Sequence, residues 1–105
     1  DPTFVEAARV FGQRIMSAGG ATLADKLSYA FQHAVARSPS AAEQQALAEI
    51  WQQQKTLYEQ ETTAAAQLVG QGASVQAETL DTVEHAAWTA LASVLLNLDE
   101  TITRE

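Results

Sequence analysis

The stretch AAWTALASVLLNLDETITRE, residues 86–105, decides the fold. Between Ala86 and Leu98 its polar side chains are Thr89, Ser93 and Asn97, which follow one another at four-residue intervals. Four residues advance a helix about 40° past one full turn, so these side chains form a narrow stripe on an otherwise apolar helix. A helix that is apolar nearly all round is buried. The stretch therefore predicts a central core helix that the other helices of the chain surround.

Apolar spacing predicts four main helices along the chain. Their expected ranges are about 3–18, 23–36, 41–60 and 81–97, and a further short helix is expected over 64–68. No strand pattern of useful length occurs. The sequence therefore predicts an all-α domain over residues 1–105. We expect a compact fold of four helices, or of four plus one short helix, with an orthogonal or bundle-like arrangement.

The helix boundaries are predicted from capping residues. Ser40-Ala41-Ala42-Glu43 reads as a capping box, in which a hydroxyl and a carboxylate satisfy free backbone N–H groups at a helix start. Thr22 with Asp25, and Asp81 with Glu84, show variants of the same spacing. Gly19-Gly20 is expected to end the first helix, because glycine adopts the left-handed conformation freely. Pro39 is expected to stop the second.

Composition and charge exclude several classes of function. The formal net charge is −7, which repels the phosphates of nucleic acids and anionic membrane surfaces. No apolar stretch reaches the roughly 20 residues needed for insertion into a membrane. The chain has no cysteine, which excludes disulfides, thiolate catalysis, zinc fingers and covalent haem attachment within it.

Candidate sites are few, and each has a plainer structural interpretation. Asp81, Glu84 and His85 lie within one turn and could hold a metal ion, but capping already explains both carboxylates. His33 has no acidic or nucleophilic neighbour in its pattern. Trp88, like Trp51, is spaced as a core anchor rather than a binding-site aromatic. We therefore expect no catalytic residue, no metal and no cofactor.

The last helix and the residues that follow it hold the remaining candidates for an interaction with a partner. These candidates are Trp88, Asn97, Asp99 and Glu100. The two acidic residues are expected to begin an exposed tail. Alternatively, they could face an active site shared with other domains of a larger enzyme.

Three segments carry a resemblance to a known family. DPTFVEAARVFGQRIM, ARSPSAAEQQAL and AAWTALASVLLNLDETITRE resemble, in this order, the C-terminal region of a planctomycete domain of unknown function. That domain is found at the end of large multi-domain proteins that often carry c-type cytochrome-like modules upstream. The resemblance spans nearly the whole chain and is most specific in AAWTALASVLLNLDE. It implies a C-terminal helical domain of an exported, periplasmic or otherwise extracytoplasmic protein.

Two departures limit what the resemblance implies. Similar sequences usually have an aromatic residue where this chain has Thr101, so its C-terminal end is expected to pack more loosely. The cytochrome motifs are absent, so haem binding is assigned to no residue here. The chain also opens on Asp1-Pro2 without an initiating methionine or a signal peptide, which favours an excised piece of a larger protein.

Three hypotheses on function follow. The first is a non-catalytic helical module with a structural or protein-interaction role, whose partners are the upstream domains of its parent protein. The second is a domain that completes the active site of a larger enzyme. The third is a helical binding module that self-associates as a homodimer through an apolar face left exposed.

Overall fold

Side-chain caps mark the starts of three of the helices that the structure describes, those that begin at Leu23, Ala41 and Thr82. The computed structural model describes residues 2–70 and 81–103, and the side chains of 3–70 and 81–98. In this part of the chain every regular element is a helix: α1 (Pro2–Ala18), α2 (Leu23–Val35), α3 (Ala41–Gln60), α4 (Thr62–Val69) and α5 (Thr82–Thr103). The all-α prediction is therefore confirmed, with α4 as the expected short helix.

Hydrogen bonds confirm the predicted helix starts. The Ser40 hydroxyl accepts from the Glu43 N–H at 3.1 Å, and the Glu43 carboxylate accepts from the Ser40 N–H at 2.8 Å. Thr22 accepts from the Asp25 N–H at 3.1 Å, and Asp81 accepts from the Glu84 N–H at 3.0 Å. These bonds satisfy N–H groups that have no partner within their own helix.

Two residues in the left-handed region mark the ends of α1 and α2. Gly20 has φ +114°, as expected for a glycine after a helix. Ala36 has φ 68°, and its N–H donates to the Gln32 carbonyl oxygen at 2.8 Å. Alanine takes this conformation less readily than glycine. The second helix thus ends before Pro39, because the chain has already turned at Ala36.

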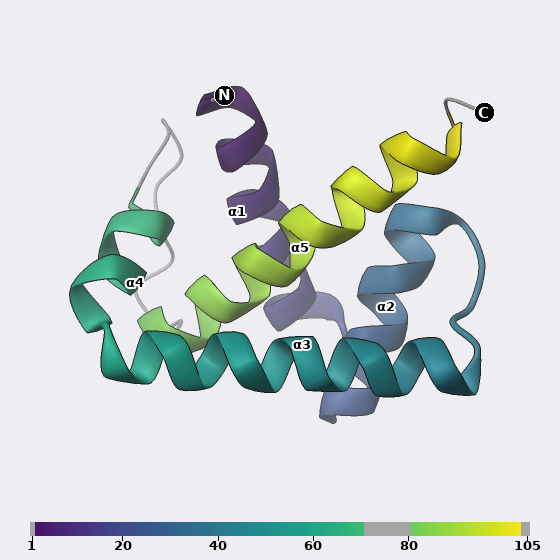
Figure 1. The fold of residues 1–105 in the computed structure, drawn as a ribbon, viewed down its shortest axis with the longest axis horizontal. Helices are drawn as coiled ribbons and strands as arrows, with labels where there is room; N and C mark the ends of the chain where they lie inside the picture. Colours follow the sequence, from purple (N-terminus) through teal and green to yellow (C-terminus); the bar gives the residue numbers. More distant parts are fainter. Residues whose placement is uncertain (1, 71–80, 104–105) are drawn as a thin grey trace.

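Helix α5 lies at the centre of the fold and packs against each of the other four helices (Figure 1). Its Trp88, Leu91 and Leu95 are at most 1% exposed. They form the main core with residues of the three longer neighbours: Phe11, Ile15, Leu27, Phe31, Leu47 and Trp51. The prediction that α5 is the core helix is confirmed.

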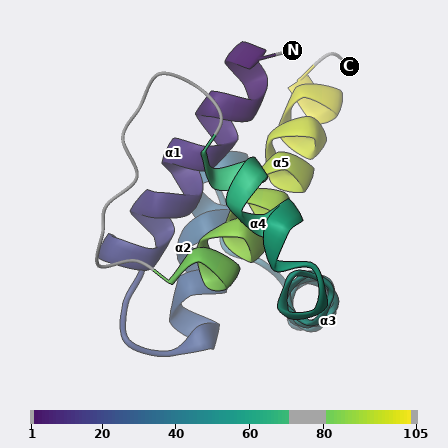
Figure 2. The same ribbon diagram turned by 90° about the vertical axis from the view of Figure 1, so that its left-hand side faces the viewer.

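A second, smaller core lies where α4 covers the start of α5. Ala65, Val69 and Ala86 are buried there, and Tyr58 packs against them. Figure 2, in which α3 is seen almost end on, shows α4 beside the first turns of α5.

Three predictions on α5 and its neighbours were wrong. Helix α5 continues to Thr103, so Asp99 and Glu100 belong to the helix and do not begin a tail. Val94 and Leu98 are 44% and 41% exposed, so the neighbours do not cover α5 completely. Leu57 follows Ile50 and Trp51 at helical spacing, which predicts a place on the apolar stripe of α3, but it is 41% exposed. Among the described residues, no helix is long and apolar enough to cross a membrane.

Candidate functional site

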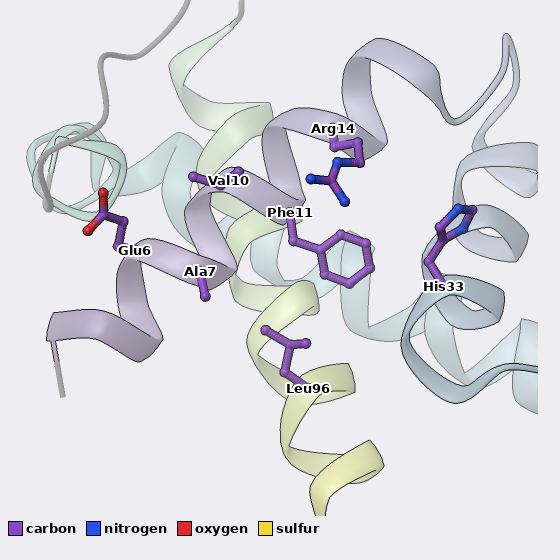
Figure 3. Close-up of a pocket in the computed structure, with 7 residues that line it drawn as sticks. All are labelled: Glu6, Ala7, Val10, Phe11, Arg14, His33 and Leu96. Carbon is purple, nitrogen blue, oxygen red and sulfur yellow. The ribbon is translucent and has the colours of Figure 1, made fainter.

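A half-open cleft of about 480 Å³ lies between α1, α2 and the C-terminal half of α5 (Figure 3). Helices α1 and α5 are in close contact near Gly12 and Thr89 and diverge toward the end of the molecule where α1 begins (Figure 1). Phe11 and Leu96 lie side by side in the cleft. The lining residues are Glu6, Ala7, Val10, Phe11, Arg14, His33 and Leu96.

Most of the cleft surface comes from one stripe of α1. Ala7, Val10, Phe11 and Arg14 have the spacing i, i+3, i+4 and i+7, which places them on one face over two turns. Ala7 is exposed and Val10 is half-buried. An apolar stripe with this spacing is the face by which a helix packs on a neighbour. Here a part of that face is left uncovered.

Arg14 stands at the rim of the cleft and is exposed. Among the described residues, its guanidinium makes no hydrogen bond and no ion pair. The other exposed or half-exposed cations of that part of the chain are engaged. Lys26 donates to the Gly20 carbonyl oxygen at 2.9 Å, and Lys55 lies 5.3 Å from the centre of the Trp51 ring.

Arg37, in contrast to Arg14, forms a salt bridge with a carboxylate of the same chain. Its guanidinium donates to both carboxylate oxygens of Glu43, each at 2.8 Å. The hydrogen bond from Arg37, helped by that from the Ser40 backbone, lowers the pKa of Glu43 to about 2. Arg14 has the same forked set of donors, but no carboxylate of the described residues receives them.

His33 forms the α2 side of the cleft. Its ring stacks on that of Tyr29, with ring centres 4.0 Å apart. Its Nδ1 lies 2.9 Å from the Tyr29 carbonyl oxygen. Because a carbonyl oxygen only accepts, Nδ1 carries the proton. The ring is thereby held in one orientation, and Nε2 is the nitrogen left for a ligand.

A buried polar cluster lies on the other side of α1, where it touches α5. The His85 Nε2–H donates to the Arg9 carbonyl oxygen at 3.0 Å, and the Thr89 hydroxyl donates to the His85 carbonyl oxygen at 2.7 Å. Arg9, His85 and Thr89 are each 0% exposed. The three guanidinium nitrogens of Arg9 and Nδ1 of His85 have no hydrogen-bond partner among the described residues.

Burial determines the protonation of His85. Removal from water disfavours the charged ring and lowers the pKa of His85, and the nearby Arg9 charge acts in the same direction. The hydrogen bond to the Arg9 carbonyl oxygen opposes this shift without reversing it. His85 is therefore a neutral structural residue that links α5 to α1, and it is enclosed rather than open to a substrate.

Of the four predicted interaction residues, the side chains of Trp88 and Asn97 are described, and these two do not share a surface. Trp88 is 1% exposed, and its ring centre lies 5.4 Å from that of Trp51, so its assignment as an interaction residue was wrong. Its size and apolar character place it in the core. Asn97 is exposed on α5. Asp99 and Glu100 lie further along α5, and their side chains lie outside the described residues.

Asp81 and His85, which were candidates for a shared metal site, make separate contacts at the start of α5. Asp81 caps the helix through the Glu84 N–H, whereas His85 points its Nε2 at α1. In the described ranges, no group of three or more histidine, aspartate or glutamate residues is placed to hold a metal ion.

Sequence reasoning missed the cleft and the role of Arg9. The signal for the cleft was present, because Arg14 occupies the same helical face as Val10 and Phe11. No spacing pattern in the sequence indicates that Arg9 is buried. No protein-family model, curated protein or solved structure matches the chain.

Proposed function

We propose that the chain is a non-catalytic helical interaction module that docks a helix of a partner in the cleft between α1, α2 and α5. The observation that carries this proposal is the partly uncovered stripe of α1 that lines the opening, on which Ala7 is exposed, Val10 is half-buried and Phe11 is buried. An amphipathic helix laid into an apolar groove is a common mode of peptide recognition. Leu96 of α5 supplies the opposite wall.

The lining of the cleft favours binding over catalysis. Among the described residues, it offers one carboxylate, one guanidinium and one imidazole, and no hydroxyl or thiol nucleophile. The imidazole of His33 donates from Nδ1 to a backbone carbonyl oxygen and not to a carboxylate that would support a general base. The remaining surface is alkyl and aromatic, which suits apolar side chains of a partner.

The partner in this proposal belongs to the same protein. The resemblance to a C-terminal domain of large multi-domain proteins supports a parent chain whose upstream part supplies the docked helix. Under this proposal the parent is exported, and the module is linked to cytochrome-like domains through the chain and not through a haem of its own.

The test uses the chain labelled with ¹⁵N and the polypeptide that precedes it in the same reading frame, expressed separately. In a titration followed by NMR, we expect shifts of the amide signals of Ala7, Val10 and Leu96. Ala7→Arg adds a long charged side chain at an exposed cleft position and should abolish binding. Ala46→Arg makes the same change on the exposed face of α3 and should leave binding intact.

Several outcomes would contradict the proposal. Shifts confined to α3, or binding that Ala7→Arg leaves unchanged, would place the interaction elsewhere. A concentration-dependent dimer in light scattering that Ala7→Arg disrupts would identify a second copy as the occupant. A reading frame with no upstream polypeptide would refute the proposed partner.

A further inference from the structure

The free guanidinium at the rim of the cleft indicates the chemistry of the partner, and this inference rests on the proposed function. We infer that the docked helix carries a carboxylate side chain that pairs with Arg14 at the α2 end of the cleft. Apolar side chains of the same helix then lie over Phe11 and Leu96. The partner is thus an amphipathic helix with an acidic residue at one fixed position.

The contrast among the cations of the chain supports the carboxylate. Arg37 donates to a carboxylate, Lys26 to a carbonyl oxygen, and Lys55 lies over an aromatic ring. Arg14 is the exposed cation of the described residues for which no such partner is present. A guanidinium at the edge of an apolar surface is suited to a bidentate pair with a carboxylate.

The shape of the exposed stripe supports a helix rather than a small molecule. Ala7 and Arg14 are two turns apart on one helical face, which corresponds to about 10 Å along the axis. A second helix placed alongside would cover this length with side chains spaced at i, i+3 or i+4. Ala7 has a small side chain, which allows the backbone of the second helix to approach.

The negative net charge of the chain restricts where the acidic residue of the partner helix can bind. At −7 the molecule repels acidic partners over long range, and salt weakens this repulsion. A carboxylate is therefore favoured next to Arg14 and disfavoured over most of the remaining surface. The pair selects the register and direction of the partner helix more than it adds affinity.

The first step of the test is a selection with the whole 105-residue chain. A displayed library of 18-residue amphipathic helical peptides is selected on the wild type and counter-selected on Ala7→Arg. We expect enriched peptides to share Asp or Glu at one position relative to their apolar anchors. Enrichment without a shared acidic position would overturn this inference and leave the docking proposal standing. No enrichment over Ala7→Arg would contradict both.

The second step measures the charge pair directly. The best enriched peptide is synthesised with Glu and with Gln at the shared position, and both are titrated against the wild type, Arg14→Gln and Lys55→Gln. We expect the Glu peptide to bind the wild type roughly threefold to fivefold more tightly than the Gln peptide. Arg14→Gln should remove this preference, whereas Lys55→Gln makes the same change in net charge and should preserve it.

Two results of these titrations would overturn the inference. Equal binding of the two peptides to the wild type would show that the carboxylate is not recognised. An equal loss of preference in Arg14→Gln and Lys55→Gln would assign the effect to overall charge and not to Arg14.

Discussion

Arg9 and Arg14 lie five residues apart on α1, and their surroundings are opposite. Arg9 is 0% exposed beside the contact between α1 and α5, and Arg14 is exposed at the rim of the cleft. Neither guanidinium has a hydrogen-bond partner among the described residues. The two residues lie on different faces of α1, Arg9 beside the contact with α5 and Arg14 on the face that lines the cleft. On one side α5 touches the backbone of α1, and on the other it diverges and leaves a groove.

On the side of α1 that faces α5, which we call the closed side, the two helices are in backbone contact at Gly12 and Thr89. A Cβ atom added to Gly12 would lie 2.9 Å from the backbone nitrogen of Thr89 and 3.1 Å from its Cα. The hydrogen bond from His85 to the Arg9 carbonyl oxygen links the helices at the same place. On the side of α1 that lines the cleft, which we call the open side, Ala7 is exposed. The two sides should therefore respond differently to matched substitutions.

The largest difference is expected for added volume. Gly12→Val would force α1 and α5 apart, because its Cβ meets backbone atoms that cannot rotate away. We expect the free energy of unfolding to fall by about 3 kcal/mol, as in other overpacked interiors. Ala7→Val adds volume on the exposed side of the same helix and should cost only a few tenths of a kcal/mol. Urea unfolding followed by circular dichroism measures both.

Gly12→Ala provides the sharper control. In a helix without a close neighbour, this change stabilises by roughly 0.5–1 kcal/mol. A stabilised Gly12→Ala variant would mean that α1 and α5 are not in backbone contact at Thr89. It would remove the basis of the comparison.

Exchange of each arginine for methionine should also give different results. A buried guanidinium without a partner is unfavourable, because it has lost its hydration. Arg9→Met retains an unbranched side chain that fills the space, and we expect a gain of about 2 kcal/mol in the free energy of unfolding. Arg14→Met changes an exposed residue and should stay within about 0.5 kcal/mol. A loss of stability in Arg9→Met would reveal a partner for this guanidinium beyond the described residues.

Much of the fold could be predicted because its signals are local. The capping box at Ser40 and Glu43 marks the start of α3 within the sequence itself. The apolar stretch around Leu91 and Leu95 indicates a buried helix without knowledge of its neighbours. The predicted end of α5 at Asn97 is too early, because the charged Asp99 and Glu100 do not stop the helix. Charged residues are compatible with a helix that continues, and α5 extends to Thr103.

The site could not be predicted in the same way, because it depends on how the helices are placed. Arg9 and Arg14 both interrupt apolar stretches of α1, and only the position of α5 separates their environments. The contact between His85 and Arg9 joins residues 76 positions apart in sequence. Trp88 was counted among the interaction residues, although its apolar spacing already favoured the core. The spacing of Val10 and Arg14 could have indicated the cleft, but not that it is open.

The stability of the protein should depend on pH through His85, which lies at the contact between α1 and α5. In the unfolded chain a histidine titrates near 6.5, and burial lowers the pKa of His85 in the fold. Well above pH 7, His85 is neutral in both states and contributes no pH dependence. As the pH falls below about 6.5, the unfolded chain binds this proton first, so the free energy of unfolding decreases. The slope contributed by this single proton has an upper limit of about 1.4 kcal/mol per pH unit.

The variant His85→Gln tests whether this slope comes from His85. It retains an N–H donor for the Arg9 carbonyl oxygen and should flatten the dependence between pH 7 and 5.5. A slope that persists unchanged in His85→Gln would contradict its assignment to His85.

The smallest expected effect separates two hydroxyls on the same polar stripe of α5. Thr89 is buried against Gly12 and donates to the His85 carbonyl oxygen at 2.7 Å, whereas Ser93 is half-buried one turn later. Thr89→Val keeps the shape and a similar helix propensity, so its cost of about 1 kcal/mol in the free energy of unfolding comes from the lost hydrogen bond. Ser93→Ala should change stability by less than about 0.5 kcal/mol in the same urea titrations. Equal effects would mean that the stripe acts as one unit. Unequal effects would show that each hydroxyl matters only as far as α1 closes over it, as with the two arginines.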